Sequence, residues 1–141
     1  MGRKLAREET MKILFQMEMN KNFSDELIEL YLQENNFAND ELEYITNAVN
    51  TIRDNLKEID NKIKDNIKGW KLDRLAKVDL SVLRIAVYEI GYRDDIPIEV
   101  SINEAIEICK KYSTDESSKF INGVLGNYVR TGMDRKWINC F

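Results

Sequence analysis

Apolar residues recur along this chain at spacings of three and four, and strict alternation of apolar and polar residues is sustained nowhere. The first spacing is typical of amphipathic α-helices, whereas half-buried β-strands alternate. The pattern therefore predicts an all-α protein of about seven helices and no strands, joined by short connections. The first of these helices covers roughly 3–20.

Several helix starts are marked by residues that cap helices. Ser24 precedes two acidic residues, which suit the first turn of a helix. Ser101 and Glu104 have the S-x-x-E spacing of a capping box, so we expect another helix to open at Ser101. The last helix is expected to begin at Thr114 or Asp115.

Two segments show special apolar patterns. From Leu42 to Ile67 the steps of three and four continue without a break, which predicts one long helix from about Asn39 to a C-cap at Gly69. From about 79 to 90 the chain is apolar around most of the helical circumference, which is typical of a central, buried helix. Arg84 lies in that helix, and we expect it to hold a carboxylate in a structural ion pair, because an unpaired buried charge is costly.

Composition narrows the functional class. The chain has 141 residues, a net charge of -4 and no histidine, the commonest general base and metal ligand. It contains no glycine-rich phosphate-loop motif and no calcium-loop motif. An enzyme is therefore the least favoured class, and no cofactor or metal is expected.

The two cysteines and the hydropathy bear on the compartment. Cys109 and Cys140 are far apart in sequence, and free thiols in a reducing compartment are the simpler interpretation. No stretch approaches the roughly 20 apolar residues that span a bilayer. The sequence predicts a cytoplasmic protein without a membrane segment.

The most informative feature is a group of three cations at the start of an acidic chain. Arg3, Lys4 and Arg7 share one face of the first predicted helix, and Met11 and Phe15 continue that line. Guanidinium groups bind phosphate oxygens, and an aromatic ring stacks an unpaired base with roughly 1–3 kcal/mol. The combination suits single-stranded RNA, and the alternative is a solvated helix end without a ligand.

Three longer stretches are distinctive in combination: GRKLAREETMKILFQMEM, LSVLRIAVYEI and DIPIEVSINEAIEICKKYSTDESSKFINGVLG. Together they resemble the NusB family of bacterial transcription antitermination factors, over nearly the whole chain to about Arg130. The resemblance implies two packed helical bundles and an RNA-binding subunit without catalysis. It divides the chain into a NusB-like domain over 1–130 and a C-terminal tail over 131–141.

The resemblance also implies ligands and site residues. It implies that the protein recognises boxA-type single-stranded RNA together with NusE, a small-subunit ribosomal protein, and joins the antitermination complex of RNA polymerase. The implied RNA-binding residues are Arg3, Lys4, Arg7, Phe15 and Lys119, and the implied partner-binding residues are Glu89, Glu116 and Phe120. The last three also have structural interpretations, as an ion-pair partner of Arg93, a first-turn acid and a core aromatic.

Other interpretations stay open from the sequence. A helical protein–protein adaptor would use the same fold without binding RNA. The RNA-binding domain of an rRNA methyltransferase would fit if the chain were a fragment of a longer protein. The sequence also leaves open whether the free protein forms a homodimer.

Overall fold

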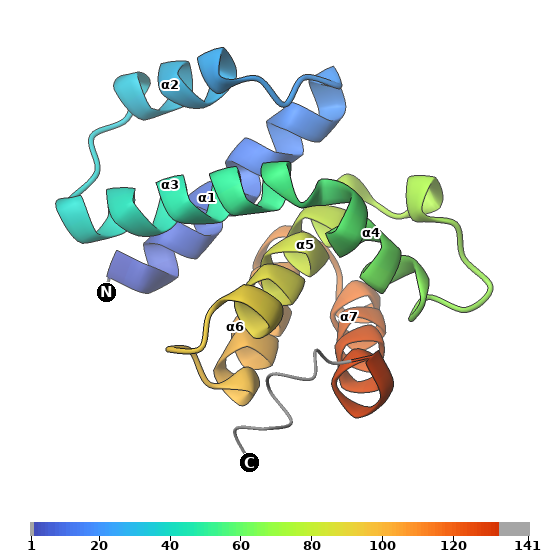
Figure 1. Cartoon of the computed structure of the whole chain (residues 1–141). Helices are drawn as coiled ribbons and strands as arrows, with labels where there is room; N and C mark the ends of the chain where they lie inside the picture. Colours follow the sequence, from blue (N-terminus) through green and yellow to red (C-terminus); the bar gives the residue numbers. More distant parts are fainter. Residues whose placement is uncertain (1, 133–141) are drawn as a thin grey trace.

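The computed structural model describes residues 2–132, which form helices and short connections without a strand (Figure 1). This confirms the predicted all-α class. The elements are α1 (Gly2–Asn20), α2 (Asp25–Glu34), α3 (Asn39–Asp54), α4 (Leu56–Lys64), the 3₁₀ turn η1 (Leu72–Arg74), α5 (Lys77–Tyr92), α6 (Ile98–Tyr112), α7 (Asp115–Asn127) and the π-helical turn η2 (Tyr128–Gly132).

The helices are arranged as two packed groups. In the first, α1 packs against α3 and contacts α2, and in the second, α5 contacts α4, α6 and α7 (Figure 1). The two groups meet where α1 packs on α5. The start of α1 and the connection between α4 and α5 lie at opposite sides of the view in Figure 1.

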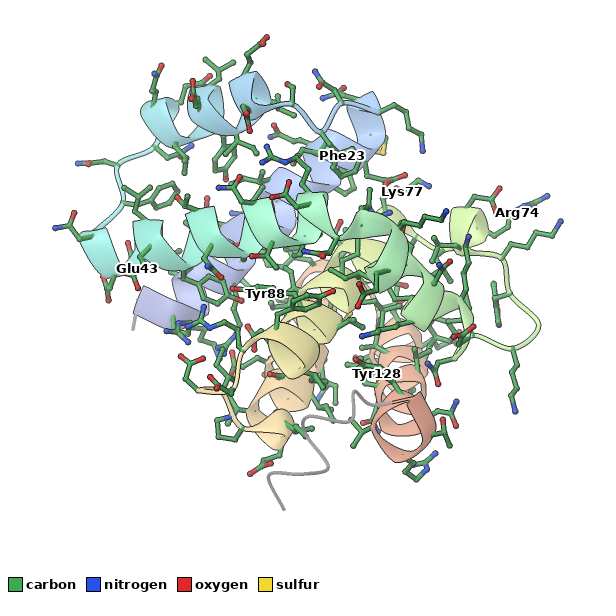
Figure 2. The ribbon with its side chains drawn as sticks, in the orientation of Figure 1. Phe23, Glu43, Arg74, Lys77, Tyr88 and Tyr128 are labelled. Atoms are coloured by element: carbon green, nitrogen blue, oxygen red, sulfur yellow. The ribbon has the colours of Figure 1, made fainter. Side chains whose placement is uncertain are left out.

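Helix α5 is the central helix that the sequence predicts. Every residue from Asp79 to Gly91 is buried, because α5 is covered by helices of both groups. Tyr88 is fully buried and lies near the centre of the molecule (Figure 2). Apolar side chains on all sides of one helix therefore hold the two groups together.

The buried arginine of α5 has the carboxylate partners that its position requires. Arg84 donates two hydrogen bonds of 2.9 Å to Asp60 and one of 2.7 Å to Glu18. Burial alone would lower the pKa of Arg84, but these bonds outweigh it and raise the pKa. The expected structural ion pair is confirmed, and it ties α5 to both α1 and α4.

The expected capping residues have different outcomes. Ser24 caps α2 by accepting from the Leu27 amide, and Thr114 caps α7 by accepting from the Ser117 amide. The capping box at Ser101 is wrong, because α6 begins one turn earlier, after Pro97. Proline has no amide hydrogen to leave unsatisfied, so it is well suited to a helix start.

The long helix predicted from Asn39 to Gly69 is also wrong. The chain breaks at Asn55, whose φ of -122° and ψ of 26° are not helical. The Asn55 side-chain amide donates to the Thr51 carbonyl at 2.8 Å and so caps the end of α3. The apolar pattern continues across the break because α3 and α4 both pack on α5.

The expectations about the cysteines, the C-terminal tail and a membrane segment can be compared with the structure only over residues 2–132. Cys109 is a free thiol and fully buried, whereas Cys140 lies outside the described residues. The predicted tail boundary falls inside η2, and positions 133–141 also lie outside. Within the described part of the chain, no helix has both the length and the apolar content needed to cross a bilayer.

Candidate nucleic-acid interface

The first turn of α1 presents two of the three predicted cations to solvent. Arg3 and Lys4 are both exposed. The Arg3 guanidinium lies 5.0 Å from the centre of the Tyr44 ring, a cation–π contact that leaves its N–H groups free for an anion. The Lys4 ammonium lies 3.6 Å from a carboxylate oxygen of Glu104. Glu104 therefore faces α1 and does not cap α6.

The third cation, Arg7, is in the interior. Its side chain is only 6% exposed, and its Nε donates to Glu89 Oε2 at 2.6 Å while Nη2 donates to Oε1 at 3.2 Å. Burial alone would lower the pKa of Arg7, but the bond and charge of Glu89 raise it. Arg7 is thus held by an ion pair with two hydrogen bonds. The sequence predicted it on the surface, but the structure buries it.

Glu89 is the centre of this buried network. It is 1% exposed and also accepts hydrogen bonds from the hydroxyl groups of Tyr44 and Ser101. Burial and the Glu89 charge raise the pKa of Tyr44 well above its ordinary value. Because these four residues come from α1, α3, α5 and α6, the carboxylate joins the two helix groups and is not exposed to a partner.

Three further side chains differ from the sequence interpretation. Arg93, expected to pair with Glu89, instead holds Asp95 through two bonds of 2.8 Å. Met11 is 3% exposed, and Phe15 is half-buried against the core. The expected surface line from Lys4 through Met11 to Phe15 is therefore interrupted, because most of this helical face packs inward.

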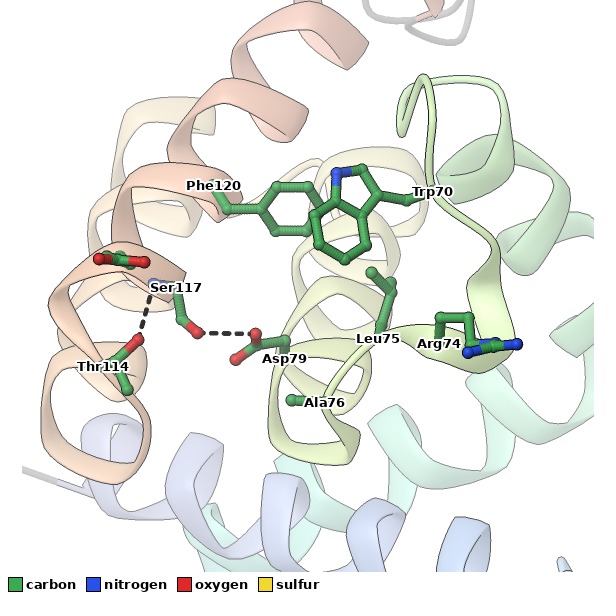
Figure 3. A pocket seen from close by; sticks show the side chains of 9 residues that line it. Trp70, Arg74, Leu75, Ala76, Asp79, Thr114, Ser117 and Phe120 are labelled. Carbon is green, nitrogen blue, oxygen red and sulfur yellow. Dashed lines mark hydrogen bonds between the residues drawn. The ribbon is translucent and has the colours of Figure 1, made fainter.

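The other predicted residues gather on α7. Glu116 and Lys119 are exposed, and Phe120 is half-buried. Glu116 and Phe120 line a hollow of about 300 Å³ between α7 and the start of α5 (Figure 3). The structure therefore brings the two expected partner-binding residues of α7 together, but it places them on a different helix from Arg3 and Lys4.

The same hollow contains residues that the sequence interpretation missed. Trp70 is 58% exposed, and its ring centre lies 5.8 Å from that of Phe120 (Figure 3). Asp79 is 6% exposed, and its Oδ2 accepts from Ser117 at 2.8 Å while Oδ1 has no hydrogen-bond partner among the described residues. The available signal was the stretch KGWKLDR, which places a tryptophan among cations.

No group of three or more acidic or cysteine side chains in the range 2–132 is arranged to hold a metal ion. What the surface does offer is exposed cations and aromatic rings, which are the groups that bind phosphates and unpaired bases.

Comparison with known proteins agrees with this picture. The sequence profile described as the NusB family matches residues 4–130 of the chain. A transcription antitermination protein NusB from Clostridium novyi (strain NT) is 46% identical over 132 residues, which cover 92% of this chain and 99% of the relative.

Solved structures agree over a similar length. The structure of T. maritima NusB superimposes with a TM-score of 0.86 and 37% identity, covering 97% of this chain and 96% of that one. A structure of antitermination factors NusB and NusE in complex with dsRNA superimposes with a TM-score of 0.83 and 28% identity, covering 92% of this chain and 96% of that one.

Proposed function

The chain belongs to the NusB family, and from this premise we propose that it is an RNA-binding transcription antitermination factor that acts with NusE. We propose that it recognises boxA-type single-stranded RNA and joins the elongating RNA polymerase in the cytoplasm, without a catalytic step of its own. The observation that carries the proposal is the family match over residues 4–130, together with the two exposed cations at the start of α1.

At the first turn of α1, we assign different roles to residues of similar charge. Arg3 and Lys4 bind phosphate oxygens, because both are exposed and only Lys4 has an ion pair, with Glu104. Arg7 is a positioning residue, since its guanidinium donates two hydrogen bonds to Glu89. The ion pair fixes the helical turn that carries Arg3 and Lys4. Phe15 and Lys119 remain predicted RNA contacts, one half-buried on α1 and one exposed on α7.

The NusE contact is assigned to the hollow beside α7. Glu116 and Phe120 line it, and the unpartnered Oδ1 of Asp79 lies in its wall. An apolar hollow with carboxylates suits a protein partner that inserts an apolar or cationic side chain, because a buried acceptor gains from receiving a donor.

The RNA contact is tested by fluorescence anisotropy with a labelled boxA-type RNA at several salt concentrations. The double variant Arg3→Ala, Lys4→Ala is expected to lower the salt slope of log K by about 1.4, since each lost phosphate contact on a single strand contributes about 0.7. The control is Lys57→Ala, an exposed lysine on α4, which is expected to leave the slope unchanged. An unchanged slope for the double variant would exclude the α1 site, and salt-independent binding would favour the adaptor.

The partner contact is tested by adding NusE. We expect NusE and RNA to bind more tightly together than either does alone, and Glu116→Lys to weaken the complex. Glu99→Lys is the matched control, because it is also an exposed acid in the first turn of a helix. If both charge reversals leave NusE binding unchanged, the hollow is not the contact.

A further inference from the structure

The segment from the end of α4 to the start of α5 carries positive charge that the described residues do not neutralise. Residues 64–77 contain five cations and two acids, in a chain whose net charge is -4. Four of these cations are exposed and have no ion pair with any described residue: Lys64, Lys68, Lys71 and Arg74. Figure 2 shows the Arg74 side chain extending outward from the molecule.

An aromatic ring lies in the middle of this charge. Trp70 is more than half exposed, with Phe120 supporting one side of its ring. The turn that carries it is ordered by hydrogen bonding, because the Trp70 amide donates to the Ile67 carbonyl at 3.0 Å. Gly69 has a φ of 81°, a left-handed conformation that glycine adopts without strain and that lets the chain turn here.

Two of the carboxylates near the cluster are already occupied. Trp70, Lys64 and Lys71 line a second hollow of about 590 Å³, which also contains Glu18 and Asp60. Both of these acids are bound by Arg84, at 2.7 Å and 2.9 Å. They are therefore not available to neutralise the lysines at the rim. The third acid of this hollow, Asp73, is exposed, so the two lysines Lys64 and Lys71 exceed the remaining carboxylates by one.

We propose that the connection 65–76 is a second contact for single-stranded RNA, in which Trp70 stacks on one base while Lys68, Lys71 and Arg74 bind the flanking phosphates. The proposal rests on the proposed function and extends its RNA surface from α1 to the opposite side of the molecule. An exposed indole among unpaired cations is the arrangement that binds single strands without a base preference, since every base has a π-face.

The stacking is tested through the fluorescence of Trp70 itself. The chain has two tryptophans, so Trp137→Phe leaves Trp70 as the only indole. A single-stranded RNA of about 12 nucleotides is expected to quench that emission. An abasic ribose-phosphate strand of the same length carries the same charge without bases, and it is expected to bind without comparable quenching.

The binding energy is tested by substitution. Trp70→Ala is expected to weaken RNA binding by about fivefold to a hundredfold, whereas Trp70→Phe keeps a ring and restores most of it. The triple variant Lys68→Ala, Lys71→Ala, Arg74→Ala is expected to lower the salt slope by about 2. The control is Lys57→Ala, an exposed lysine on α4 that has no ion pair with a described residue and is expected to leave the slope unchanged. Thermal unfolding confirms that each variant is folded.

The outcomes separate this proposal from the function on which it rests. If Arg3 and Lys4 contribute to RNA affinity but Trp70 is not quenched by RNA, the second contact is overturned and the proposed function stands. Quenching by NusE alone, without any by RNA, would assign the indole to the protein partner and also overturn it. Quenching by RNA that is lost in the triple variant supports it.

Discussion

The start of α1 and the connection between α4 and α5 are similarly basic in sequence and different in structure. At the start of α1, Arg7 is bound by Glu89 and Lys4 lies near Glu104, so that only Arg3 has no ion pair with a described residue. Of the four exposed cations between Lys64 and Arg74, none has an ion pair with a described residue. The number of cations in a segment is therefore a poor guide to the charge that it offers a ligand.

The difference follows from what lies beneath each segment. α1 packs on α3 and α5, so one of its faces must be buried, and a cation on that face needs an internal carboxylate. The connection runs over the surface, where cations keep their hydration and need no partner. The first region uses charge mainly to hold the fold, and the second leaves charge for binding.

The largest expected effect is on the stability of the protein when the buried Arg7 of α1 is replaced. Arg7→Ala leaves Glu89 buried without its cation and is expected to lower the free energy of unfolding by about 3–5 kcal/mol. Arg74→Ala, in the exposed connection, is expected to change it by less than about 0.5 kcal/mol. Urea unfolding of both variants measures the difference, and similar values for the two would contradict the contrast.

Acid is expected to act on α1 through two of its carboxylates. Glu8 accepts hydrogen bonds from Lys111 and Tyr112, and Glu18 from Lys21 and Arg84. Burial would raise the pKa of both carboxyls, but these bonds outweigh it and hold each pKa below the ordinary value of 4.5.

The sign of the pH dependence follows from these lowered pKa values. The stabilisation is fully present above the unfolded-state pKa of about 4.5 and is lost as the pH falls through the lower folded-state values. Urea unfolding at a series of pH values should therefore show stability falling below about pH 4.5. Glu8→Gln should be less stable at pH 7 and show a smaller loss in acid, and an unchanged loss would exclude Glu8 as a source.

A smaller effect is expected from the turn that carries Trp70. Gly69→Ala forces a side chain into a left-handed conformation and is expected to cost about 1 kcal/mol, although no atom lies near the added methyl group. Gly123→Ala is the control, because it also has open space but lies within α7, where alanine is expected to stabilise by up to about 1 kcal/mol. Opposite signs in thermal unfolding confirm the assignment, and equal signs contradict it.

The smallest expected effect is on RNA binding and concerns the one acidic residue of η1 in the connection. Asp73 is exposed within η1, next to the cluster of unpaired cations. Asp73→Asn removes a repulsive charge and is expected to strengthen RNA binding by less than about threefold at low salt, with no gain at high salt. Weaker binding on this substitution would show that RNA does not follow the connection.

Much of the fold could be predicted because helices are encoded by local spacing. The buried circumference of α5 and the caps at Ser24 and Thr114 are visible in short windows of sequence. The break at Asn55 is not, because the apolar pattern depends on what the helices pack against and continues across it. Capping residues also mislead when a competing start, here Pro97, lies one turn upstream.

The site was harder to predict because its charges are paired across the chain. Glu89 lies 82 residues from Arg7, so no local pattern shows that these two residues meet. Arg84 could be expected to need a carboxylate, because its helix is apolar on all sides, but its partners Glu18 and Asp60 could not be named. Trp70 was recognisable in principle, since a tryptophan among lysines is unusual in an acidic chain.

The hydrogen bonds at Glu89 also limit how α1 can be engineered. Arg3 and Arg7 are the same amino acid one helical turn apart, yet Arg3 is exposed and Arg7 is buried in a network that joins α1 to three other helices. A library that randomises Arg3 and Lys4 should yield folded proteins with altered ligand preferences. Extending the same library to Arg7 should mostly yield misfolded chains, so retargeting has to stop one turn into the helix.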